Sequence, residues 1–118
     1  MGREDQEQLA YMCWVRMYKD LSDYTIHIAN ERQTSPARGA KLKRMGVKAG
    51  VPDIFIMKPT KLYHGLWIEL KVRPNKPTKT QLEFIDNAKS EGYAAIVCYG
   101  ADNAITATER YLRNLRVE

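Results

Sequence analysis

The sequence predicts one mixed α/β domain with the element order α-β-(α)-β-β-α-β-α, in which helices cover both faces of a mixed sheet. Three observations favour this class. Residues 53–57 and 65–72 are rich in β-branched and aromatic residues and flank a turn-like segment at 58–61, which indicates a hairpin. Residues 94–99 form a near-continuous apolar run, which is typical of a central strand covered on both faces. Amphipathic segments of helical period surround these strands.

The first half of the chain provides the elements that lead to the hairpin. Residues 4–19 read as a helix that is apolar over much of its circumference, and residues 25–28 read as a short strand. Residues 30–37 have turn chemistry, and residues 37–45 are expected to form one or two helical turns that end at Gly46. Pro52 is compatible with the first position of a strand, where no ladder bond is lost.

The second half supplies two further helices around the apolar strand. Thr78 and Gln81 fit a capping box at the start of a helix that ends at Gly92. Asp102 is expected to cap the last helix, which extends to Leu115. Both helices carry apolar residues at helical spacing, so each should pack one face on the sheet.

The hairpin register brings three charged residues together. Opposed residues in an antiparallel pair have a constant index sum, so Asp53 faces Glu69 if the turn is centred on residue 61. Side chains alternate between faces, so Lys71 shares the face of Glu69 at about 7 Å. We expect the two carboxylates to hold a divalent metal beside the lysine. The alternatives are that Asp53 only caps a turn and that Glu69 and Lys71 form a surface pair.

The charge of the chain is unevenly distributed. The sequence of 118 residues has a net charge of +5, yet residues 32–50 contain basic residues and no acid, and residues 58–79 contain one acid, Glu69. Two basic blocks that flank an acidic site predict a polyanionic partner, with phosphates bound by lysine and arginine. The alternative is a pair of solvated loops with a chance bias in charge.

Several classes of protein are not expected. No stretch approaches a membrane span or a signal peptide, which favours a cytoplasmic protein. Cys13 and Cys98 have apolar neighbours, which predicts buried free thiols and no disulfide. His27 and His64 lack the spacing of a zinc site. The sequence has no glycine-rich phosphate loop, so no nucleotide cofactor is expected, and it has no Ser-His-Asp arrangement.

The ordered set of motifs resembles a known nuclease family. The supporting segments are residues 27–31, 43–53, 65–72, 80–84 and 92–93, together with a glutamate-rich first helix that contains Gln8. In this order they resemble the virus-type replication-repair nuclease (VRR-NUC) family of the PD-(D/E)XK superfamily. The resemblance implies a restriction-endonuclease-like fold, one nuclease domain over residues 1–118, and hydrolysis of DNA phosphodiester bonds with Mg²⁺ or Mn²⁺.

The resemblance also implies a substrate class and leaves alternatives open. Stand-alone members from phages and bacteria, which match this chain in size, are thought to act as homodimers on branched DNA such as four-way (Holliday) junctions. Members embedded in larger repair proteins act more as monomeric flap nucleases. A third reading is a non-catalytic DNA-binding module, against which the intact Asp53, Glu69 and Lys71 argue. The expected location is the cytoplasm of a bacterial or phage-infected cell.

The candidate site residues follow from this chemistry and from the resemblance. Asp53, Glu69 and the main-chain carbonyl of Leu70 are the expected metal ligands. Lys71 is expected to orient the attacking water and to stabilise the charged phosphate, and we prefer this electrostatic role to that of general base.

Three further residues of the candidate site rest on weaker grounds. Gln81 matches a glutamine that the family places close to the lysine, although a capping side chain explains it equally well. Glu4 is the first-helix acid expected at the metal, because it stacks with Gln8 at i, i+4 spacing, and Glu7 is its competitor. The expected phosphate contacts are Arg38, Lys41, Lys43, Arg44, Lys48, Arg73, Lys76 and Lys79.

Overall fold

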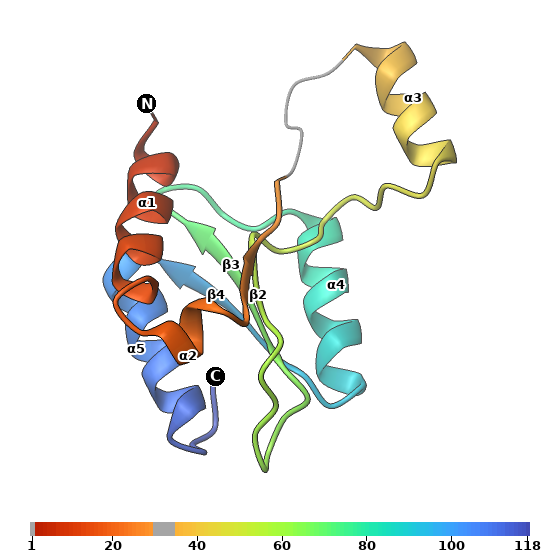
Figure 1. Cartoon of the computed structure of the whole chain (residues 1–118). Coiled ribbons are helices and arrows are strands. Elements are labelled where there is room, and N and C mark those ends of the chain that lie inside the picture. Colours follow the sequence, from red (N-terminus) through yellow and green to blue (C-terminus); the bar gives the residue numbers. More distant parts are fainter. Residues whose placement is uncertain (1, 30–34) are drawn as a thin grey trace.

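In the computed structural model, which describes residues 2–29 and 35–118, five helices surround a four-stranded mixed sheet (Figure 1). The elements are α1 (Arg3–Val15), α2 (Lys19–Ser22), β1 (Thr25–His27), α3 (Pro36–Arg44), β2 (Ile54–Ile56), β3 (Leu66–Lys71), α4 (Lys79–Ser90), β4 (Ala94–Tyr99) and α5 (Ala101–Leu112). The predicted mixed α/β class and element order are confirmed, and α2 is an addition to them.

The sheet has the strand order β1-β2-β3-β4. The first three strands are antiparallel neighbours, and β4 runs parallel to β3 after the crossover through α4. Helices α1 and α5 cover one face, and α4 covers the other (Figure 1). The expectation that residues 94–99 form a central strand was wrong, because β4 lies at an edge of the sheet. Its apolar run reflects the helices on both of its faces, not a strand on each side.

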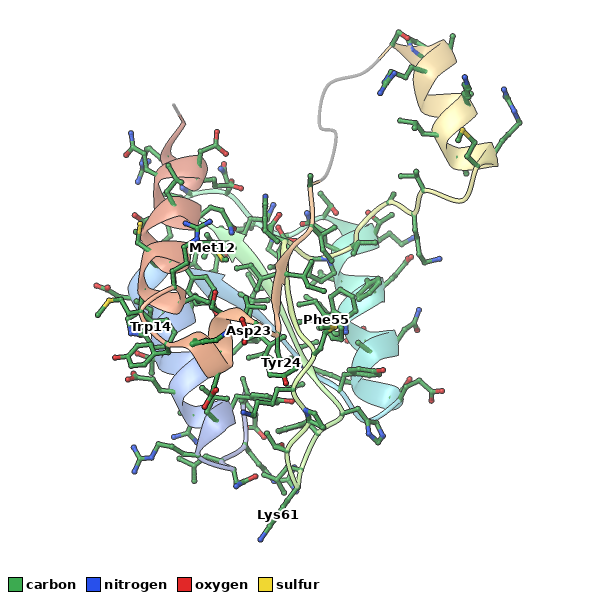
Figure 2. All side chains as sticks on the ribbon, viewed as in Figure 1. Met12, Trp14, Asp23, Tyr24, Phe55 and Lys61 are labelled. Atoms are coloured by element: carbon green, nitrogen blue, oxygen red, sulfur yellow. The ribbon has the colours of Figure 1, made fainter. Side chains whose placement is uncertain are left out.

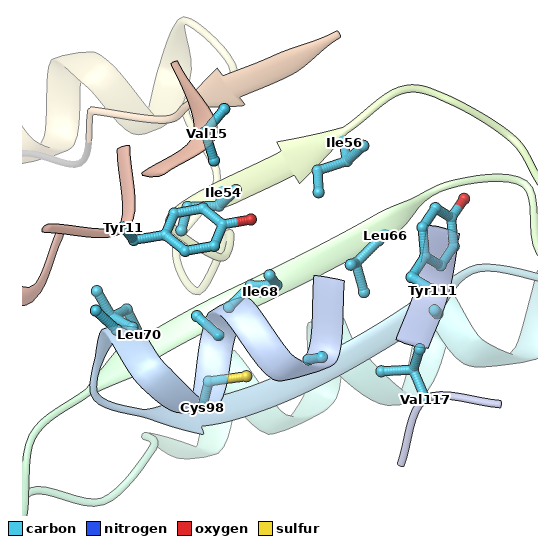
Figure 3. Packing of buried hydrophobic residues seen from close by; sticks show 14 of the residues in the cluster. Tyr11, Val15, Ile54, Ile56, Leu66, Ile68, Leu70, Cys98, Tyr111 and Val117 are labelled. Atoms are coloured by element: carbon cyan, nitrogen blue, oxygen red, sulfur yellow. The ribbon is translucent and has the colours of Figure 1, made fainter. Parts of the chain in front are cut away.

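The main core lies between the sheet and the α1–α5 layer (Figure 3). Ile54, Ile68 and Cys98 project from the sheet into this layer and are fully buried. Tyr11 of α1 is also fully buried, and its hydroxyl lies 2.7 Å from the Thr108 hydroxyl of α5. This bond satisfies two polar groups that would otherwise destabilise the interior. On the α4 face, a smaller cluster forms around Phe55 and Trp67, whose rings stack at 4.1 Å, and the α4 residues Phe84 and Ile85.

Three helix boundaries differ from the sequence expectations, one of which is the end of the last helix at Leu112 and not at Leu115. The helix expected over residues 4–19 ends at Val15, and the chain turns before α2 begins at Lys19. The last helix begins at Ala101, so Asp102 lies inside its first turn and does not cap it. The Ala101 N–H instead donates to Oε1 of Glu7 at 3.0 Å, so a side chain of α1 caps α5.

Helix α3 stands apart from the rest of the domain (Figures 1 and 2). The Ser35 hydroxyl accepts a hydrogen bond from the Arg38 N–H, Pro36 occupies the first turn, and no α3 residue is buried. Gly46 follows the helix with a φ of +103°, as expected for a glycine that ends a helix. The turn expected at 30–37 falls partly on residues 30–34, which lie outside the described residues, as does the end of the 27–31 motif.

The two cysteines differ in exposure. Both are free, Cys98 is buried as expected, and Cys13 is exposed, so the expectation of two buried thiols was wrong for Cys13. Burial raises the pKa of the Cys98 thiol to about 12, which suppresses its reactive thiolate. We predict that a thiol reagent at pH 8 modifies one cysteine in the folded protein and two in denaturant. Modification of both in the folded protein would contradict this packing.

None of the helices in residues 2–29 and 35–118 combines the length and the apolar composition that a membrane span requires.

Candidate active site

Asp53 lies immediately before β2 and is held by both neighbouring strands. Its Oδ2 accepts a hydrogen bond of 2.9 Å from the Leu70 N–H of β3. Its main-chain carbonyl oxygen accepts a bond of 2.7 Å from the Ile28 N–H and lies 3.1 Å from Nδ1 of His27. Because a carbonyl oxygen can only accept, Nδ1 of His27 carries the proton. The first contact orients the carboxylate and the other two hold the main chain of Asp53, a residue that is 4% exposed.

Glu69 and Lys71 follow on β3. The structure pairs Ile54 with Ile68, which is the register that the hairpin pattern predicts, and Asp53 lies one residue before the paired segment. Glu69 is 1% exposed and Lys71 is 8% exposed, and Nζ of Lys71 lies 3.7 Å from Oε2 of Glu69. Burying charged groups is costly unless they are paired or bind a ligand, and such groups cluster at functional sites.

A small cavity of about 50 Å³ opens beside Asp53. Its other lining residues come from α1, β1 and β3: Glu4, Asp5, Gln8, His27 and Leu70. The amide nitrogen of Gln8 is buried, and no atom of the described residues accepts its hydrogen. A ligand oxygen in this cavity would therefore meet both a carboxylate and an amide donor.

The two candidate glutamates of α1 have different surroundings. Glu4 lines the cavity beside Asp53, and its Oε2 accepts a hydrogen bond of 3.0 Å from the Asn75 amide. Glu7 points to the start of α5, where it caps the Ala101 N–H. The structure thus brings Glu4, and not Glu7, to the Asp53 cavity.

Comparison with known proteins identifies the family. The VRR-NUC domain model matches residues 2–102. The chain belongs to the VRR-NUC family. A solved structure described as a VRR_NUC domain protein is 36% identical to this chain with a TM-score of 0.85, and the match covers 100% of this chain and 94% of that one. No functionally curated protein matches the chain. VRR-NUC domains are nucleases of the PD-(D/E)XK type, which act on DNA and are generally metal-dependent.

The donor set of this VRR-NUC domain suits a hard divalent cation. In residues 2–29 and 35–118, no group of three or more His, Cys, Asp or Glu side chains could hold a metal ion by itself. Mg²⁺ prefers oxygen ligands and keeps several waters, so two carboxylates and a main-chain carbonyl are a sufficient protein contribution. Asp53, immediately before β2, and Glu69 of β3 are both buried and supply two such carboxylates.

The position of Glu4 and Glu7 leads to a prediction. Glu4→Gln is expected to weaken metal-dependent cleavage by about tenfold or more, because it removes a negative charge beside Asp53. Glu7→Gln keeps an oxygen that accepts from Ala101 and should retain wild-type cleavage. Cleavage rates of the two variants under matched metal concentrations test this. A larger loss of cleavage rate in Glu7→Gln than in Glu4→Gln would contradict the assignment of Glu4 to the site.

Gln81 forms the capping box of α4. Its side-chain Oε1 accepts a hydrogen bond of 2.8 Å from the main-chain N–H of Thr78, and its main-chain N–H donates to the Thr78 hydroxyl. The segment before Asp53 packs against this helix start, because a Cβ added to Gly50 would lie 2.5 Å from the carbonyl group of Thr80. Gln81 therefore has a structural role, and its catalytic role stays a prediction.

The basic residues fall into two groups. Arg38, Lys41, Lys43 and Arg44 lie on α3, and Lys48 lies in the segment that returns to the domain, all of them exposed. The second group lies between β3 and α4, where Arg73 and Lys76 are exposed and Lys79 lies 4.0 Å from Glu83. The first group is carried away from the active site by α3, whereas the second follows Lys71 directly along the chain.

Sequence reasoning did not assign a site role to Asp5 or a specific contact to His27. Asp5 and Gln8 lie three residues apart and share a helix face. Helical spacing could therefore have predicted that Asp5 lines the same cavity as Gln8. The contact of His27 with Asp53 depends on the pairing of β1 with β2, and no local signal in the sequence gives that register.

Proposed function

We propose that this VRR-NUC domain is a divalent-metal-dependent endonuclease that cleaves branched DNA, and that it resolves four-way junctions as a homodimer in the cytoplasm of a bacterial or phage-infected cell. The observation that carries this proposal is the set of three buried charged residues, Asp53 immediately before β2 and Glu69 and Lys71 on the adjacent β3. A purely structural β-hairpin has no need for such a costly arrangement.

Each residue of the site has a proposed role. Asp53, Glu69 and the Leu70 carbonyl would hold Mg²⁺ or Mn²⁺, with Glu4 nearby. The ion supplies charge neutralisation for the phosphate and the acidity that makes water a nucleophile. Lys71 donates hydrogen bonds to the phosphate and to the attacking water, which lowers the energy of the charged transition state. The hydrogen bonds to Asp53 keep its carboxylate in place, which reduces the reorganisation needed for reaction.

The basic residues supply the affinity for DNA. The exposed cations of α3 and Lys48 would contact phosphates at a distance from the cut, and Arg73, Lys76 and Lys79 would contact those near it. Such contacts position a duplex without reading its sequence, so binding should be strongly salt-dependent. A helix that extends from the domain suits branched DNA, because it can reach a second arm of the junction.

A homodimer requires an apolar surface that the domain leaves exposed. Tyr11 and Tyr111 are fully buried inside the domain and are not available to a partner. Leu9 of α1 is exposed, as are Met17 and Tyr18 in the segment between α1 and α2. Tyr18 packs edge-on against Trp14, which lies on the outer side of α1 (Figure 2). We propose that the aromatic pair of Trp14 and the exposed Tyr18, with Met17 beside it in the chain, contributes to the dimer interface.

The proposal is tested with labelled four-way, flap, nicked and linear DNA in Mg²⁺, Mn²⁺ or EDTA. We expect paired incisions in the four-way junction with either metal, little cleavage of linear duplex, and none in EDTA. Sedimentation at micromolar concentration should show a dimer. A monomer that cleaves flaps in preference to junctions would instead support the flap nuclease. Metal-independent binding without cleavage of any substrate would support the DNA-binding module.

A further inference from the structure

The end of β4 places an aromatic side chain beside Lys71. Tyr99 pairs with Lys71 in the parallel register of β3 and β4, and the Gly100 N–H donates to the Lys71 carbonyl at 3.0 Å. Cys98 belongs to the core on the α1–α5 side, and Val97 packs in the cluster on the α4 side. Because side chains alternate along a strand, Tyr99 lies on the α4 side with its partner Lys71.

Arg73 stacks on Tyr99. Its Cζ lies 4.2 Å from the centroid of the Tyr99 ring, within the range of a cation–π contact. Among the described residues, no carboxylate forms an ion pair with Arg73, whereas Lys79 has Glu83 at 4.0 Å. The ring occupies one face of the guanidinium and leaves its N–H edges available to an anion. A guanidinium held in a fixed orientation matches the oxygens of a phosphate.

We propose that Arg73 and Tyr99 form a phosphate clamp for the DNA strand that is cut, with Tyr99 as the residue that positions Arg73. Arg73 follows Lys71 by two residues and stands at the turn that ends β3, so the two cations lie close together at the end of this strand. With Lys71 at the scissile phosphate, Arg73 therefore binds the neighbouring one. This inference rests on the proposed nuclease function and adds a subsite to it.

The charges around Arg73 determine which of its edges can bind a phosphate. Arg73 lines an open cavity of about 390 Å³ together with Val72, Asn75 and the first residues of α1. Glu4 and Asp5 also line this cavity, and their carboxylates repel a phosphate. The clamp therefore holds its phosphate at the edge of Arg73 that faces away from α1.

The test is the affinity for a labelled four-way junction, measured by fluorescence anisotropy in Ca²⁺ at several salt concentrations. Arg73→Gln should weaken binding by about tenfold and reduce the salt slope by about 1, as expected for one lost phosphate contact. Tyr99→Leu should weaken binding by about two- to fivefold, and Tyr99→Phe, which keeps the ring, should bind like the wild type. The double variant Arg73→Gln/Tyr99→Leu should bind no more weakly than Arg73→Gln.

A matched control exists elsewhere in the domain. Nζ of Lys58 lies 5.7 Å from the Tyr24 ring, and Tyr24→Leu removes this second cation–π contact. It should leave junction affinity unchanged. Equal losses in Tyr24→Leu and Tyr99→Leu, or additive losses in the double variant, would overturn the clamp. If Tyr99→Leu does not fold, the clamp is tested with Arg73→Lys. This variant keeps the charge, so its salt slope should stay that of the wild type while its affinity falls about two- to fivefold. An unchanged affinity of Arg73→Lys would contradict the clamp.

Cleavage in Mg²⁺ separates this inference from the proposed function. If the wild type cleaves junctions, and Arg73→Gln and Tyr99→Leu bind them with wild-type affinity, the nuclease is retained and the clamp is excluded. If the variants show the predicted binding losses but the wild type does not cleave any junction, the clamp is retained and the nuclease is excluded.

Discussion

Replacing Asp53 by asparagine is expected to reduce metal-dependent cleavage by at least about 10²–10³-fold and to leave the fold intact. The substitution removes the charge that a divalent cation requires. It keeps an amide oxygen that can accept the hydrogen bond of the Leu70 N–H, and the main-chain contacts of residue 53 are unaffected. The loss should therefore appear in the cleavage rate and not in the affinity for DNA.

The measurement is the single-turnover rate on a four-way junction, with thermal unfolding of each variant as the check on folding. Asp86→Asn is a suitable control, because Asp86 is an exposed residue of α4. It should cleave like the wild type. Equal cleavage by Asp53→Asn and the wild type in Mn²⁺ would remove Asp53 from the catalytic site.

Gly50→Ala is expected to lower both stability and activity, because the chain at Gly50 is in close contact with the start of α4. Its φ is +84°, and an added Cβ would lie 2.5 Å from the carbonyl carbon and oxygen of Thr80. The left-handed backbone alone costs about 1–3 kcal/mol for a residue with a side chain, and the contact adds to this. Asp53 follows three residues later, so a shift of about 1 Å there can reduce the rate about 10²-fold.

Gly46→Ala separates these two causes. Gly46 also has a positive φ, of +103°, but an added Cβ would meet no atom within 4 Å. This variant should lose only the backbone contribution, and its cleavage rate should stay close to that of the wild type. The free energies of unfolding from denaturant titration test the comparison. Equal stability losses in the two variants would show that packing against Thr80 does not position the segment before Asp53.

The hairpin could be predicted because its determinants are local. The alternation of residues 65–72 and the position of the turn fix the pairing of Ile54 with Ile68, which is the register expected from the index sum of Asp53 and Glu69. The capping box of Thr78 and Gln81 is equally local, and the structure confirms it. Both features depend on residues close to one another in the chain.

The features that escaped prediction depend on distant contacts. No glycine or proline marks the end of α1 at Val15, so the apolar spacing predicted a helix that extends to residue 19. The cap of α5 comes from Glu7, which is 94 residues away in sequence. The edge position of β4 is set by the strand order, which an apolar run does not encode. The same holds for the contact of His27 with Asp53.

The most direct test of the site is the location of bound Mn²⁺ from paramagnetic broadening of backbone amide signals, with Mg²⁺ as the diamagnetic reference. We predict that substoichiometric Mn²⁺ broadens the signals of Ile54, Leu70 and their neighbours first, and that Asp53→Asn abolishes this broadening while its spectrum remains that of a folded protein. Broadening centred elsewhere in the domain, or unchanged in Asp53→Asn, would contradict a metal site between Asp53 and Glu69.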